Sequence, residues 1–130
     1  MHRAHLLIVT AVAEGGTGLL LLVLPSVPLA LLLGVEQPSP EAFVIARVAG
    51  AALLAIGVAC WLARNDKRTS ALLGLLIGVL IYDVAAAALL AYAGLVLSLA
   101  GIALWPAVVL HLALAVWCGV CLFVRPSAVS

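Results

Sequence analysis

Long apolar stretches separated by short polar segments dominate this chain. The first runs over about residues 4–24, where Pro25 ends it, and the second over about residues 42–63, before the polar run 64–68. A helix needs about 20 mostly apolar residues to cross roughly 30 Å of hydrocarbon, so each stretch is long enough for one crossing. The pattern therefore predicts two membrane-spanning helices in the first half of the chain.

The second half contains a longer apolar run that must fold back on itself. Over residues 69–124 the only charged residue is Asp83, and a single helix of this length would measure about 84 Å. Glycine and serine cluster between residues 93 and 101, and these residue types favour a turn. We therefore predict two further spanning helices, over about residues 70–92 and 102–124.

These spans predict an all-α fold, an antiparallel bundle of four transmembrane helices that forms a single transmembrane domain over residues 1–130. Ser39 suits the N-cap of the second span, and Pro40 suits its first helical position. Between the first two spans, the apolar segment 29–35 is too short to cross a bilayer. We expect it to form a short interfacial helix, to dip into the membrane and return, or to pack on the bundle as an apolar loop.

The composition excludes several classes of protein. Apolar residues make up 68% of the chain and charged residues 8%, whereas soluble domains average about 45–50% and about 25%. These figures exclude a soluble enzyme and a disordered tail. A net charge of +1 offers no electrostatic surface for DNA or RNA, so we expect no nucleic-acid partner.

The basic residues indicate how the bundle is oriented. Short loops that carry Lys and Arg stay on the cytoplasmic side of a membrane. Apart from Arg47, the basic residues all fall on one side of the predicted topology: Arg3, Arg64, Lys67, Arg68 and Arg125. The pattern predicts a multi-pass protein of the bacterial inner membrane with both termini in the cytoplasm.

Each predicted span carries one ionisable residue within its apolar stretch: Glu14, Arg47, Asp83 and His111. A charge at mid-bilayer costs about 2.5–3.5 kcal/mol on insertion scales, so such residues normally face the bundle interior and pair. Three of them lie near their helix midpoints, and the long Arg47 side chain can reach the same depth or extend to the outer interface. We expect all four to form one buried cluster.

The charges of this expected cluster do not balance. Two carboxylates and one guanidinium leave one excess negative charge, so a carboxylate should hold a proton, His111 should be protonated, or a cation should bind. Such a group suits ligand binding or proton coupling. The alternative is that the four residues pair only to hold the helices together.

Cys118 and Cys121 form a Cys-x-x-Cys motif directly after Trp117. A thioredoxin-type motif lies at a helix start, where the helix dipole favours a thiolate, whereas this one lies near a helix end. Together with Cys60 it falls toward the reducing cytoplasmic side, which disfavours a structural disulfide. We therefore expect these thiols to serve packing, with a redox site at Cys118 and Cys121 as the alternative, and we expect no metal site.

Part of the first half of the chain resembles a group of small membrane proteins. Residues 46–57 read Ala-Arg-Val-Ala-Gly-Ala-Ala-Leu-Leu-Ala-Ile-Gly, and the preceding span ends at Leu24-Pro25. This combination resembles small bacterial four-helix membrane proteins of the DoxX-like kind. The resemblance implies a four-helix membrane fold and carries no residue roles.

A second resemblance lies in the first span. Ala13-Glu14 with Gly16-Thr17 is similar to the first helix of small multidrug resistance transporters, which are four-helix proteins with a membrane-embedded Glu. The remainder of the chain departs from that pattern, because it adds Arg47 and Asp83 within the spans and has a longer outer loop. The likeness therefore implies a similar chemistry at Glu14 and no membership of that family.

These observations predict a small membrane protein without catalytic residues, which binds a small ligand or lipid or serves as an accessory subunit of a membrane assembly. Its partners would be lipid, other membrane subunits or further copies of the chain. The motif Gly74-x-x-x-Gly78 is of a kind that can mediate association between copies. No particular cofactor is indicated. One alternative is a proton-coupled small transporter using Glu14 and Asp83. The other is a thiol or quinone oxidoreductase using Cys118 and Cys121.

Overall fold

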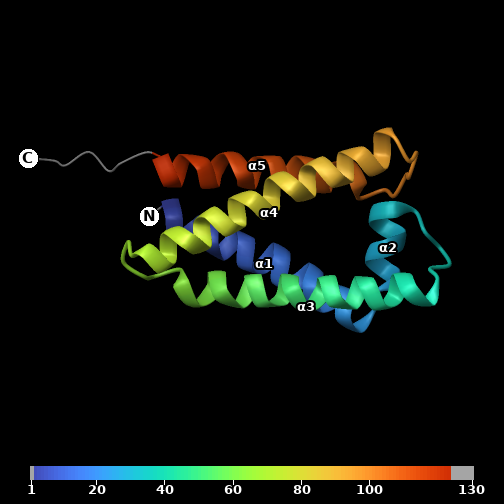
Figure 1. Cartoon of the computed structure of the whole chain (residues 1–130), viewed down its shortest axis with the longest axis horizontal. Helices are drawn as coiled ribbons and strands as arrows, with labels where there is room; N and C mark the ends of the chain where they lie inside the picture. The colour runs from blue at the N-terminus through green and yellow to red at the C-terminus, as the bar shows by residue number, and fades with distance from the viewer. Residues whose placement is uncertain (1, 124–130) are drawn as a thin grey trace, which may run out of the picture.

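The computed structural model describes residues 2–123, and it contains four long helices and one short one (Figure 1). All four long helices are long and apolar enough to cross a membrane, which confirms the predicted fold class. Val124 and Arg125, which the sequence placed at the end of the last span and beyond it, lie outside the described residues. The helices are α1 (His2–Val23), α2 (Ser26–Leu33), α3 (Pro40–Ala63), α4 (Ser70–Leu95) and α5 (Leu104–Phe123).

The four long helices run alternately in opposite directions (Figure 1). The start of α1, the α3–α4 connection and the end of α5 lie at one end of the bundle, which we call the basic end because it carries Arg3, Arg64, Lys67 and Arg68. The short helix α2 lies across the opposite end, which we call the α2 end.

Two of the long helices, α3 and α4, have a side-chain N-cap at their start. The Ser39 hydroxyl accepts a hydrogen bond of 3.3 Å from the Ala42 amide, as the sequence predicted for α3. The Thr69 hydroxyl accepts one of 3.2 Å from the Leu72 amide at the start of α4. These bonds satisfy amides that have no partner within the helix.

Helix α4 ends later than the sequence predicted, at Leu95 instead of near residue 92. The helix continues through Gly94, and the Val96 amide donates a hydrogen bond of 2.9 Å to the Tyr92 carbonyl at its end. Beyond the end of the helix, Ser98 has a φ of 54°, which lies in the left-handed region. The glycine and serine cluster thus marks the turn correctly, although the helix continues through Gly94.

The long helices form two closely packed pairs, α1 with α3 and α4 with α5, and fewer contacts join one pair to the other. Glycines allow α1 and α3 to pack closely against each other. A Cβ atom added to Gly57 would lie 2.7 Å from the Cα of Gly15, and one added to Gly18 would lie 2.7 Å from the Gly50 carbonyl oxygen. Small residues allow such an approach between membrane helices.

The two pairs meet in an apolar core at the basic end of the bundle. This core contains residues from all four long helices, such as Leu7, Cys60, Leu76 and Leu114. Most of the large apolar side chains outside the core are exposed, as expected for surfaces that face lipid. Toward the α2 end the pairs separate, and this separation positions the site described below.

Helix α2 contacts the connection between α4 and α5. The Ala103 amide donates a hydrogen bond of 2.8 Å to the Leu31 carbonyl, and Gly101 packs directly against the backbone of Leu31 and Leu32. The left-handed Gly34, with φ of 70°, ends α2 and lies against Ala100. The short apolar segment after α1 is therefore a helix that packs on the bundle.

Candidate functional site

Three of the four ionisable residues predicted within the spans converge between the two helix pairs. His111 Nδ1 on α5 lies 3.0 Å from Asp83 Oδ1 on α4 and 3.8 Å from Glu14 Oε1 on α1. The cluster thus links α4 and α5 to each other and joins their pair to α1. The predicted meeting of Glu14, Asp83 and His111 in the interior is confirmed, and we call these three residues the polar cluster.

Helix periodicity places Asp83 and His111 on buried faces of their helices. Val79 and Ala87, one turn on either side of Asp83, are buried. Val108 and Leu114 flank His111 in the same way on α5. Because residues three and four apart share a helix face, the apolar neighbours direct both polar side chains toward the interior.

The three residues of the polar cluster are almost completely buried. Asp83 is 0% exposed, Glu14 3% and His111 9%. The Asp83–His111 hydrogen bond satisfies Oδ1, but Oδ2 of Asp83 has no hydrogen-bond partner among residues 2–123. A buried carboxylate oxygen without a partner is costly, which makes this atom a place for an additional ligand or proton.

Arg47 does not join the cluster, so this part of the predicted arrangement is wrong. Its side chain is exposed, and its Nε donates a hydrogen bond of 3.3 Å to the carbonyl of Leu22. Leu22 lies eight residues along α1 from Glu14, a distance of about 12 Å. The carbonyls in the last turn of a helix have no partner within it, and a guanidinium there also complements the helix dipole.

The absence of Arg47 changes the charge of the site. With both acids ionised and the imidazole neutral, Glu14, Asp83 and His111 together carry two negative charges. If the imidazole is protonated, their net charge is −1. Neither state is neutral in a low-dielectric interior. Neutrality requires further protons on these residues or a bound cation.

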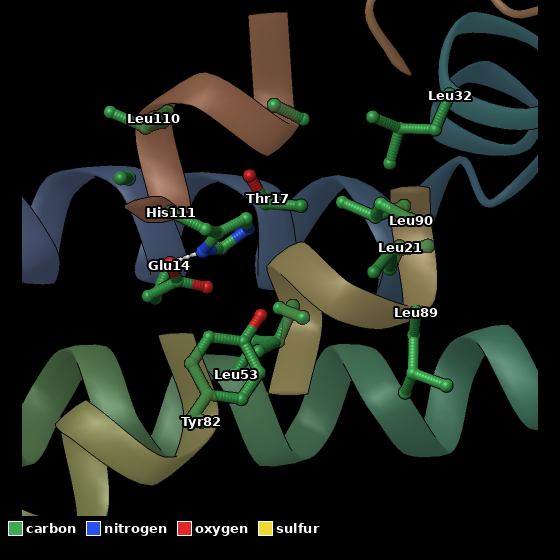
Figure 2. Close-up of a pocket in the computed structure, with 13 residues that line it drawn as sticks. Glu14, Thr17, Leu21, Leu32, Leu53, Tyr82, Leu89, Leu90, Leu110 and His111 are labelled. Carbon is green, nitrogen blue, oxygen red and sulfur yellow. Dashed lines mark ion pairs between the residues drawn. The ribbon is translucent and has the colours of Figure 1, made fainter. Parts of the chain in front are cut away.

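A cavity of about 340 Å³ adjoins the cluster on the side of the α2 end (Figure 2). Glu14, Tyr82 and His111 form its polar end, and Thr17 adds a hydroxyl. The other lining residues are apolar: Ala13, Leu21, Leu32, Leu53, Ala86, Leu89, Leu90, Ala107 and Leu110. All five helices contribute to the wall, and α2 does so through Leu32.

Tyr82 and Thr17 are site residues that sequence reasoning missed. The Tyr82 ring packs edge-on against His111, with centroids 5.6 Å apart and an interplanar angle of 82°. Neighbouring residues on a helix project about 100° apart, so the Tyr82 side chain leaves α4 in a different direction from that of Asp83. His111 on α5 contacts both side chains, and this brings Tyr82 into the site. Thr17 could have been found, since it lies three residues from Glu14 on the same helix face.

The cysteines lie apart from the polar cluster, in the apolar core at the basic end. Cys60 and Cys118 are 0% exposed, and Cys121 packs at the edge of the same core. The Cys118 thiol donates a hydrogen bond of 3.1 Å to the Leu76 carbonyl. All three thiols are free. This environment suits packing, and the redox alternative for Cys118 and Cys121 stays a prediction.

Compared with models of protein families, with curated proteins and with solved structures, the chain matches none. No family is therefore identified, and the DoxX-like resemblance rests on residues 24–25 and 46–57 alone. The structure by itself describes a four-helix protein with four candidate membrane spans and a buried polar cluster.

Proposed function

We propose that this chain is a membrane protein that binds a small, mainly apolar molecule with one polar end group in the cavity between its two helix pairs. The observation that carries the proposal is the cavity itself, apolar along most of its wall and polar at one end (Figure 2). Ligand sites in proteins commonly combine apolar walls with a few polar groups that fix orientation.

The cavity volume limits the size of the ligand. An engineered cavity of about 150 Å³ holds one benzene molecule, and small-molecule sites commonly measure about 300–1,000 Å³. At about 340 Å³ this cavity has room for a body of about two rings. Because the wall belongs to helices embedded in apolar surroundings, the ligand would enter from the lipid phase.

The polar end can recognise both donors and acceptors. The Tyr82 hydroxyl can donate and accept, and an ionised Glu14 accepts. The hydrogen bond to Asp83 engages His111 Nδ1 and leaves Nε2 for a ligand. A hydroxyl, an amine or a similar small group at one end of the ligand fits this set.

The cellular setting that we propose follows from the sequence. The basic residues favour the bacterial inner membrane with both termini in the cytoplasm. Most of the described chain is helix of spanning length, so a protein partner would be another membrane subunit or a second copy of this chain. An accessory role as a subunit of a membrane assembly is compatible with ligand binding.

A cavity-filling substitution tests the proposal. The full chain is placed in lipid nanodiscs, and retention of radiolabelled 1-naphthylmethanol is measured against empty nanodiscs. Ala86→Phe should weaken saturable binding at least about tenfold, equivalent to about 1.4 kcal/mol, because the ring occupies the cavity. The matched control is Ala85→Phe, since Ala85 is the exposed neighbour on the same helix. Equal binding by both variants, or no saturable binding by the wild type, would contradict the proposal.

Proton-coupled transport is the second candidate function, because the cavity reaches Glu14 as a transport site would require. Transport predicts that vesicles containing the chain accumulate the charged analogue 1-naphthylmethylamine when a pH gradient is applied. Glu14→Gln should abolish this accumulation. Binding without accumulation rejects transport and leaves the binding function in place.

A further inference from the structure

We propose that the polar cluster is a binding site for one divalent transition-metal ion, held by the carboxylates of Glu14 and Asp83 and the imidazole of His111. The position opposite these ligands would open toward the cavity. This inference does not rest on the proposed function. The metal needs only the three cluster residues, whereas the cavity ligand shares Glu14 and His111 with that site but needs no metal.

The geometry of the donor atoms suits such an ion. One ligand atom from each of the three residues lies within 4.8 Å of the others. Bonds of about 2.1 Å in a tetrahedral zinc site place two ligand atoms about 3.4 Å apart. The two nitrogen–oxygen separations, 3.0 and 3.8 Å, lie on either side of this value. Small movements of the Glu14 side chain would therefore complete the site.

The charge of the cluster favours a divalent ion over a monovalent one. With a neutral imidazole, Glu14 and Asp83 contribute two negative charges, and Arg47 is too distant to compensate them. A metal ion with two positive charges makes the centre neutral. In an interior that excludes water, any other net charge of this centre is unfavourable.

Asp83 provides an independent indication of a missing ligand. It is 0% exposed, its carboxylate is directed at His111 through Oδ1, and its Oδ2 has no hydrogen-bond partner in the described chain. A metal ion beside His111 would give this carboxylate the partner that it lacks.

The donor set also indicates the class of metal. Imidazole and carboxylate together suit Zn²⁺, Mn²⁺, Fe²⁺ and Co²⁺, whereas a copper(I) site would need thiolate or thioether ligands. Binding replaces the hydrogen bond between His111 and Asp83 by two bonds to the metal. A neutral imidazole keeps its proton by moving it from Nδ1 to Nε2, so that Nδ1 can bind the metal. An imidazolium releases its Nδ1 proton to solvent, and Glu14 releases any proton that it holds.

Cobalt titration of the purified, chelator-treated full chain tests the proposal. We expect visible absorption bands typical of a four- or five-coordinate Co²⁺ site, saturating at one ion per chain and abolished by Zn²⁺. Asp83→Asn and His111→Gln should each weaken Co²⁺ binding at least about 100-fold, since each removes a ligand. Glu41→Gln, at the exposed start of α3, is the matched control and should bind like the wild type.

Two outcomes would overturn the metal site. One is a wild-type chain that shows no Co²⁺ bands and retains no zinc after dialysis, a result that does not depend on how the variants fold. The other is a Co²⁺ spectrum with thiolate charge-transfer bands that Cys118→Ser removes, because the ion would then lie at the cysteines. Naphthylmethanol binding measured with a chelator present separates failure of this site from failure of the cavity.

Discussion

A single hydrogen bond, between Asp83 and His111, defines the polar centre of this bundle at the scale of residues. Glu14, Asp83 and His111 could be identified from the sequence because an ionisable group at mid-depth in an apolar helix has few favourable positions except the interior. Arg47 could not be assigned in the same way. Its long side chain had a closer partner, the Leu22 carbonyl, which becomes available only because α3 packs beside the end of α1.

This difference predicts unequal effects of two substitutions on stability. Asp83→Ala should lower the free energy of unfolding by about 3 kcal/mol, because it leaves His111 buried without its partner. Arg47→Ala removes one exposed hydrogen bond and should cost about 1 kcal/mol or less. Reversible unfolding in mixed detergent micelles measures both values. A larger loss from Arg47→Ala than from Asp83→Ala would contradict the assignment of partners.

Glycines decide which helices pair at the scale of elements. The stripe of Gly15 and Gly18 on α1 meets Gly50 and Gly57 on α3, whereas Gly74 and Gly78 on α4 have no atom within 4 Å of an added Cβ. The sequence contains all of these glycines and marks the Gly74-x-x-x-Gly78 motif as readily as the others. Which of these glycines lie at a contact between two helices depends on the rotation of each helix about its axis.

Alanine substitutions should separate the two kinds of glycine. Gly57→Ala places a Cβ atom 2.7 Å from the backbone of Gly15 and should destabilise the protein by about 1–3 kcal/mol, since the helices must move apart. Gly74→Ala meets open space, so it should be neutral or stabilise by up to about 1 kcal/mol through helix propensity. Detergent unfolding of the two variants gives the comparison. Equal losses would show that α1 and α3 do not approach as described.

The whole molecule consists of two helix pairs that converge at the basic end and separate toward α2. The apolar core closes the first end, while α2 and the α4–α5 connection cover the second. The polar cluster lies where the pairs meet, and the cavity lies beside it. A ligand or metal at this position would contact both pairs and would stabilise their association by its binding free energy.

The two ends of the molecule should face opposite sides of the membrane. Single cysteines introduced at Glu36 and at Lys67, in a chain whose native cysteines are replaced, report this orientation. The positive-inside rule predicts that a membrane-impermeant maleimide labels Glu36→Cys in intact cells and labels Lys67→Cys only after the membrane is opened. The opposite labelling pattern would reverse the proposed topology.

The sequence by itself determined the four candidate membrane spans, the Ser39 cap of α3 and the three ionisable residues that meet in the interior. These features depend on hydropathy, local capping and the rise of a helix along its own axis, all of which can be read from residues near one another. Only the tertiary structure decided that Arg47 lies outside the cluster, that Tyr82 lies against His111 and that a cavity remains toward α2. The reason is that these features depend on how far each helix rotates and which helix it packs against, and neither quantity is encoded in one segment alone.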